Sequence, residues 1–144
     1  MKAALFAACE NGIIDAQSKM LSVINIMNEV SAAGFPIVLP KVSAAGILDR
    51  EAAEPTTFDC RLVISLNGEE LANLPWGIDF QGKSRLQACA TFQGLLIATA
   101  GKLRFALMHQ ATTIGAWELN IISLGPQADM FTNAGPEAAT DQEA

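Results

Sequence analysis

The stretch Phe58–Phe92, FDCRLVISLNGEELANLPWGIDFQGKSRLQACATF, decides the fold class, because its apolar residues recur at every second position. The alternation runs through three segments, residues 58–66, 72–80 and 86–92. Successive side chains of a β-strand point to opposite faces, so each segment has one apolar face and one more polar face. This pattern predicts an all-β protein built from layered antiparallel strands.

Outward from this stretch, turn signals separate further strand candidates. Asn67-Gly68 predicts a tight hairpin between the first two segments, and Pro75 places the second arm at a sheet edge or a bulge. Asn11-Gly12 predicts a turn after a first strand, and Pro36 and Pro40 are expected to interrupt regular structure between residues 35 and 41. The remaining strand candidates are Lys2–Cys9, Val42–Leu48, Gly94–Ala100, residues 103–108 and residues 117–123, the last two forming a closing hairpin.

The segment Lys19–Val30 has two interpretations. Met20, Val23 and Met27 fit a helical spacing, whereas the density of β-branched residues favours a strand. Periodicity alone slightly favours the helix.

Composition limits the class of protein. The chain has 144 residues, of which 51% are hydrophobic and 17% charged, so we expect one domain with a dry core or a sizeable interface. No apolar run approaches the roughly 18–20 residues that a membrane-spanning helix needs. The net charge is −6, and residues 125–144 carry four acidic and no basic residues, leaving −6 + 4 = −2 for the body. Without clustered cations, nucleic acid is not an expected partner.

The domain division follows from the same change in composition. Residues 1–124 are expected to form the β domain, and residues 125–144 a flexible acidic tail that contains Gly125-Pro126 and Gly135-Pro136.

The three cysteines, Cys9, Cys60 and Cys89, have neither CxxC nor Cys/His spacing, so we expect free thiols and no metal site. Free thiols fit a cytoplasmic location. The segment Met1–Cys9 resembles a lipoprotein signal superficially, but its apolar stretch, Ala3–Ala8, is shorter than a secretory signal requires, and a buried first strand is favoured.

Several motifs in this order resemble a family of uncharacterised bacterial and phage-associated proteins, a domain of unknown function with an immunoglobulin-like β-sandwich. The motifs are Lys19–Ile26, Phe35-Pro36 followed by Pro40, Gly101–Leu107 and Trp117–Ile121, and the resemblance covers about residues 2–124. It departs from the family's pattern in having Leu103 at an aromatic position and Asn25 where a glycine is common. The resemblance implies an antiparallel immunoglobulin-like β-sandwich of about seven to nine strands and a strand over Lys19–Met27. It implies no activity.

No catalytic constellation is found in the sequence. His109, the single histidine, has no acid or nucleophile beside it and is interpreted as a turn residue. The loop Asp49–Glu54 offers three carboxylates without the spacing of a calcium loop, and it is interpreted as a solvated loop. We therefore expect neither an enzyme nor a cofactor.

The expected interface is the apolar run Leu95, Leu96, Ile97 and Ala98, because consecutive apolar residues require that both faces of a strand be covered. The favoured function is a non-catalytic protein-interaction or assembly module that self-associates through apolar strand surface, with the tail involved. The alternative is a small-ligand binder with a pocket lined by Trp76 or Trp117. The expected core comprises Phe58, Leu62, Ile64, Leu74, Trp76, Phe105, Leu107 and Leu119.

Overall fold

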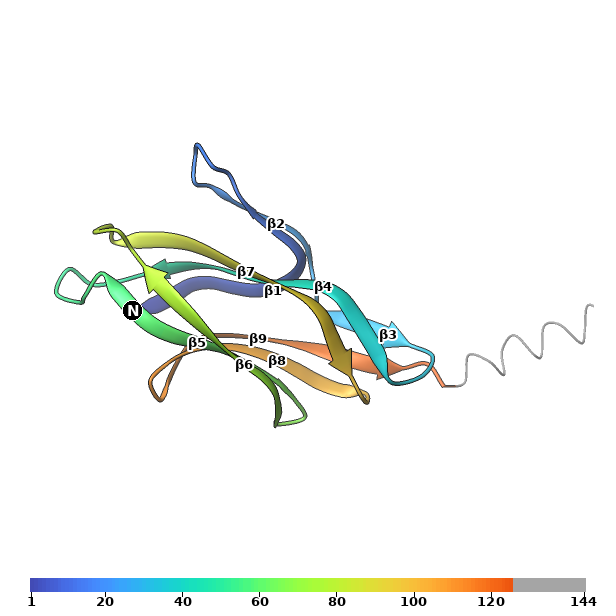
Figure 1. Ribbon diagram of the computed structural model, residues 1–144. Coiled ribbons are helices and arrows are strands. Elements are labelled where there is room, and N and C mark those ends of the chain that lie inside the picture. The colour runs from blue at the N-terminus through green and yellow to red at the C-terminus, as the bar shows by residue number, and fades with distance from the viewer. Residues whose placement is uncertain (126–144) are drawn as a thin grey trace, which may run out of the picture.

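The computed structural model describes residues 1–125, which form nine strands in two packed sheets (Figure 1). The strands are β1 (Lys2–Ile14), β2 (Leu21–Ile26), β3 (Glu29–Ala32), β4 (Ile37–Asp49), β5 (Thr57–Leu66), β6 (Glu69–Asp79), β7 (Arg85–Ile97), β8 (Gly101–His109) and β9 (Thr112–Ser123). The described part contains no helix, which confirms the all-β prediction. The predicted boundary at residue 124 and the predicted flexibility of the tail lie at or outside the described residues and stay predictions.

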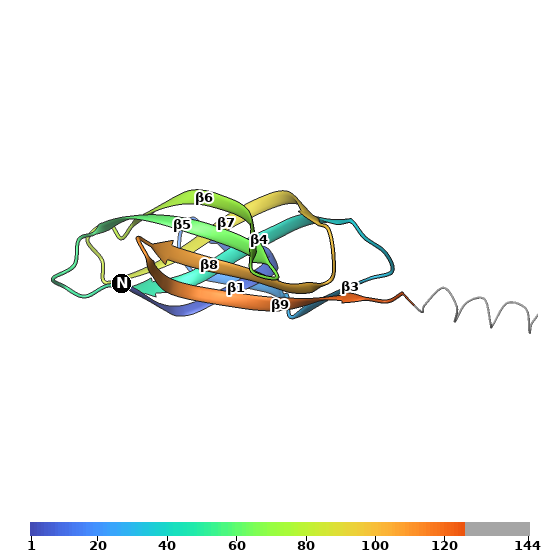
Figure 2. The same cartoon turned by 90° about the horizontal axis from the view of Figure 1, so that it is seen from below.

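One sheet has the strand order β2-β1-β4-β7 and the other has the order β3-β9-β8-β5-β6. The two sheets lie face to face, and the view from below shows their strands layered over one another (Figure 2). The prediction of purely antiparallel pairing is wrong at one place, because β3 runs parallel to β9. The chain enters β3 from the other sheet after β2, so it meets β9 in the same direction without a hairpin.

The core lies between the sheets and is built from the alternating faces seen in the sequence. Phe58, Leu62, Ile64, Phe105, Leu107 and Leu119 are all buried, as predicted. Trp76 is partly buried and packs against this core. The prediction for Leu74 is wrong: its side chain is 38% exposed, because it lies on the edge strand β6, where no further strand covers it.

The β5–β6 hairpin forms at Asn67-Gly68, as predicted, and both residues have positive φ (53° and 83°). The Asn67 side chain also accepts a hydrogen bond from the Lys102 amide (3.0 Å) and donates one to the Ala100 carbonyl (3.1 Å). Asn67 thus connects the β5–β6 turn to the turn that precedes β8. Pro75 lies on an edge strand, as predicted.

The predicted turn at Asn11-Gly12 is wrong, because both residues lie inside β1 and the chain reverses only at Asp15–Lys19. The glycine is required by close approach instead. A Cβ at Gly12 would lie 2.6 Å from the Cys89 Sγ and 3.5 Å from the Ala45 Cβ.

The end of β7 and the start of β4 also differ from the predicted strand boundaries. Residues 86–100 are not two strands, because β7 continues through Gly94, which has a φ of 76° and bends the strand without ending it. Similarly, β4 begins at Ile37 and includes Pro40. Pro40 is tolerated because this part of β4 pairs on one side only.

The ambiguous segment Lys19–Val30 is not helical: β2 covers Leu21–Ile26, and β3 begins at Glu29 after a break at Met27 and Asn28. Five residues of β1 pair with β2, and this pairing outweighs the helical periodicity.

Candidate functional site

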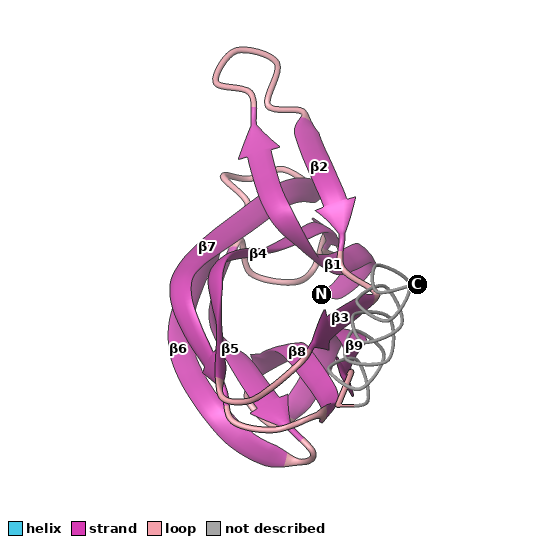
Figure 3. Ribbon diagram, turned by 90° about the vertical axis from the view of Figure 1, so that its right-hand side faces the viewer, coloured by secondary structure: helices cyan, strands magenta, loops and turns pink. Residues whose placement is uncertain are grey.

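The β1–β2 hairpin extends away from the two packed sheets (Figure 3). Strand β1 pairs with β4 as far as Cys9 and Ser43, and beyond this point it pairs with β2. At the tip, the Asp15 carboxylate accepts hydrogen bonds from the amides of Gln17 (3.0 Å) and Ser18 (2.6 Å). The bonds from Ser18 are the main cause that lowers the pKa of Asp15, so the acceptor remains ionised at neutral pH.

This hairpin carries several large apolar side chains that are exposed to solvent. Met20 near the tip is 65% exposed, and the others have exposed fractions of 36–47%: Ile13, Ile14, Ile24 and Ile26. Apolar side chains on a projecting element gain no burial from the core of their own domain. Clustered exposure of this kind is typical of a surface that contacts another protein.

The inner side of the hairpin packs against β4 and β7. The Cys89 thiol lies 3.4 Å from the Gly12 carbonyl oxygen, and Ala45 and Ser43 beneath the hairpin are buried. Cys9 is buried as well, and burial raises the pKa of its thiol. These thiols therefore serve as packing groups, and the described cysteines are all free, as predicted.

An apolar groove of about 530 Å³ lies where β1 separates from β4. Its lining combines residues from the hairpin, from the passage into β3 and from the start of β4: Glu10, Asn11, Ile24, Met27, Val30, Leu39, Pro40 and Lys41. The Lys41 ammonium donates to the Asn11 Oδ1 (3.2 Å), and the Glu10 carboxylate accepts from the Asn25 Nδ2 (3.1 Å). The groove thus has an apolar floor and charged groups at its rim.

The predicted interface residues at the end of β7 have different environments. Ile97 is buried in the core, Leu95 is partly buried, and Leu96 is 56% exposed. Leu96 pairs across the sheet with Val38, which is exposed to the same extent. Ala98 follows the strand and is exposed. The four residues thus present one exposed apolar pair, Leu96 and Val38, and their role in an interface stays a prediction.

A second apolar opening lies between the edge strands β6 and β7, with a volume of about 300 Å³. Ile64, Ala72 and Leu74 line one wall, and Phe92 and Leu95 line the other. Leu95 is the one member of the predicted interface that reaches this opening.

His109 is half-buried at the end of β8, and its Nδ1 lies 3.3 Å from the Asp59 carbonyl oxygen. Its ring packs edge-on against Phe58, with a centroid distance of 5.2 Å. The interpretation as a solvated turn residue is therefore only partly right, because this histidine has a packing role.

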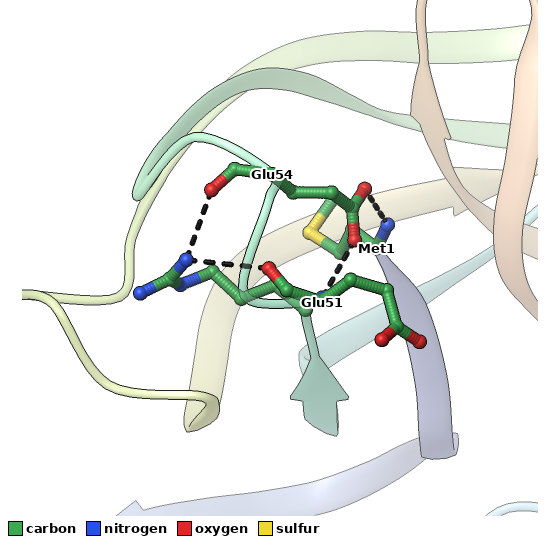
Figure 4. A network of polar contacts seen from close by, with 4 residues as sticks. Met1, Glu51 and Glu54 are labelled. Atoms are coloured by element: carbon green, nitrogen blue, oxygen red, sulfur yellow. Dashed lines mark hydrogen bonds and ion pairs between the residues drawn. The ribbon is translucent and has the colours of Figure 1, made fainter.

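The loop Asp49–Glu54 is held by its own polar contacts (Figure 4). Arg50 donates to the carbonyl of Glu54 (2.9 Å), while the Glu54 carboxylate accepts from the Glu51 amide (2.8 Å) and pairs with the Met1 ammonium. The bond from Glu51 is the first cause that lowers the pKa of Glu54. Asp49 is engaged separately by Arg85, at 2.6 and 2.9 Å.

The two tryptophans have different surroundings. The Trp117 Nε1 donates to the Met27 carbonyl (2.7 Å), which fixes the passage from β2 to β3. Trp76 contributes to the lining of a shallow hollow of about 410 Å³, together with Asp59, Arg61 and Gln110. In residues 1–125, no three His, Cys, Asp or Glu side chains gather as a metal site would require.

Comparison with known protein families gives no match to this chain, and comparison with curated proteins gives none either. Within residues 1–125, there is no helix that is long and apolar enough to cross a membrane.

Sequence reasoning missed the hairpin surface and the groove at its base. A signal was present, because Ile13-Ile14 and Val23-Ile24 place apolar residues on both faces of their strands. This is the same signal that predicts an interface at Leu95–Ala98, where consecutive apolar residues also lie on both faces of a strand.

Proposed function

We propose that this protein is a non-catalytic interaction module that self-associates through the projecting β1–β2 hairpin. The single observation that carries the proposal is the cluster of exposed apolar side chains on this hairpin, centred on Ile13 and Met20. The exposed pair Leu96 and Val38 provides a second surface, at the end of the sheet. Burying such side chains contributes about 25 cal/mol per Å² of apolar area removed from water, which favours association.

An immunoglobulin-like arrangement is part of this proposal. The order β3-β9-β8-β5-β6, with an edge strand running parallel to the last strand, supports it. The resemblance to the uncharacterised bacterial and phage-associated family remains a proposal on the motifs already quoted, as do a cytoplasmic location and the absence of catalysis.

Light scattering and sedimentation at micromolar concentration test self-association. The wild type is expected to exceed the 15.2 kDa monomer mass, and the double variant Ile13→Asp/Met20→Asp is expected to return to it. Gln17→Asp adds a charge in the turn of the same hairpin, where Asp15 is already charged and no residue pairs with Ile13, so it should leave the mass unchanged. A wild type that sediments as a monomer overturns the proposal.

A third variant separates the two candidate surfaces. If Leu96→Asp dissociates the assembly while the hairpin variant does not, the interface lies at the end of β7. Gln93→Asp, an exposed polar position on the same strand, is the matched control.

A second candidate function is small-ligand binding at the hollow beside Trp76. The observation in its favour is the presence of Asp59, Arg61 and Gln110 around one opening. Quenching of tryptophan fluorescence by a small-molecule library tests it, with Arg61→Ala as the variant expected to abolish any binding found.

A further inference from the structure

The groove at the base of the hairpin contains a strand edge without a partner. Over residues 37–42, β4 pairs with β7 on one side, and its pairing with β1 ends at Ser43. Within the described part of the chain, no other strand pairs with this edge. Unpaired strand edges next to an apolar floor accept an added strand, because backbone hydrogen bonds and side-chain burial then act together.

The end of β9 lies close to this groove. Ser123 pairs with Ala32 of β3, the Leu124 amide donates to the Ala32 carbonyl (2.8 Å), and Val30 of the same strand lines the groove. Figure 1 shows β3, the end of β9 and the start of β4 at the same end of the molecule. Gly125 is therefore about 13 Å from the level of Val30, at roughly 3.3 Å per strand residue.

The sequence after Gly125 has the composition that this groove would accept. Gly125-Pro126 is a turn signal, and Asp129-Met130-Phe131-Thr132 follows. The five residues after this turn, 127–131, span roughly 16 Å when extended, so Phe131 can reach the groove at the level of Val30 after a reversal of the chain. Met130 and Phe131 are the large apolar residues of this segment.

The charge of the groove is also complementary to that of the tail segment. The Lys41 ammonium makes one hydrogen bond, to Asn11, and has further N–H groups to donate. In the tail, Asp129 comes before the apolar residues Met130 and Phe131, and in β4, Lys41 comes after Leu39 and Pro40. An antiparallel alignment of the two segments therefore places Asp129 opposite Lys41. The Glu10 carboxylate at the rim is engaged by Asn25.

We propose that residues 128–132 of the same chain bind in the groove as an added strand on β4, with Phe131 on its apolar floor beside Leu39 and Asp129, on the same face of that strand, at Lys41. The tail then covers an apolar site beside the hairpin and competes with any partner that uses it. This inference does not require self-association: a monomer with an occupied groove supports it while overturning the proposed function.

Hydrogen–deuterium exchange on the full chain tests the inference. Amides of residues 129–132 are expected to exchange at least ~10-fold more slowly than those of residues 138–143, independently of protein concentration. Ile24→Asp, in the groove, should remove this protection. Ile13→Asp should not, because Ile13 is equally exposed on the same hairpin (47% against 44%) but does not line the groove.

Two further variants keep the test decisive if Ile24→Asp disturbs the fold. Phe131→Asp changes only the tail and should abolish protection, and Lys41→Asp should weaken it until Asp129→Lys restores it. Equal exchange across the tail of the wild type overturns the inference. So does protection that disappears on dilution to the monomer, which would place the tail in a neighbouring molecule, or protection that Phe131→Asp leaves intact.

Discussion

At the scale of single residues, two side chains with the same place in the alternating pattern can differ in how far they are buried. Leu62 and Leu74 occupy directly paired positions on β5 and β6, yet Leu62 is fully buried and Leu74 is not. Leu62→Ala is expected to lower the free energy of unfolding by about 2–5 kcal/mol, since it leaves a cavity in the core. Leu74→Ala should cost clearly less, and denaturant unfolding measures both. Equal costs would contradict the assignment of β6 as an uncovered edge.

The thiols offer a second test at this scale. Burial raises the pKa of the Cys9 and Cys60 thiols, whereas Cys89 is half-buried. Because the thiolate is the reactive form, a thiol reagent should label at most Cys89 rapidly in the native protein, and Cys9 and Cys60 only on unfolding. Mass spectrometry of the labelled protein reads this out. Rapid labelling of Cys60 in the folded state would contradict its burial on the core face of β5.

At the scale of elements, the hairpin depends on close packing between β1 and β7. Gly12→Ala is expected to destabilise the protein, because the new Cβ would meet the Cys89 Sγ at 2.6 Å. In a Cys89→Ala background, the same change should cost less, since the nearest remaining side-chain atoms are at 3.5 Å. Thermal unfolding of the wild type, the two single variants and the double variant gives the coupling free energy between the two positions. Strict additivity would mean that the hairpin does not lie over β7.

The ends of β4 and β7 are joined by Asp49 and Arg85, which are directly paired in the sheet. The hydrogen bonds from Arg85 are the first cause that lowers the pKa of Asp49. Since the folded-state pKa lies below the unfolded value of about 3.9, this pair contributes stability above that pH and loses it as the pH falls through the folded pKa.

We therefore expect Asp49→Asn to reduce stability at pH 6 and to flatten its decline between about pH 4 and pH 2. Melting temperatures across this range measure the effect. Arg85→Gln, which removes the other member of the pair, should flatten the decline in the same way. Identical profiles for Asp49→Asn and the wild type would contradict the role of this pair.

At the scale of the whole molecule, stability should be uneven. The sandwich is held by a continuous buried core, whereas the outer part of the hairpin, residues 13–23, has few buried side chains. In native-state hydrogen exchange, amides of residues 13–23 should open with lower free energy than those of residues 60–64, which open with global unfolding. If self-association covers the hairpin, this difference should shrink as protein concentration rises. Equal protection in a dilute monomer would contradict a separately projecting hairpin.

The sequence by itself determined the all-β class, the central strands and most of the core. These features depend on alternation within a few residues and on turn residues such as Asn67-Gly68, and both act locally. The tertiary structure alone decided that Leu74 is exposed, that Asn11-Gly12 continues a strand, and that β3 runs parallel to β9. It also placed the groove where β1 leaves β4. Alternation specifies which face of a strand is apolar, but the neighbour of each strand edge depends on pairing between residues distant in the chain.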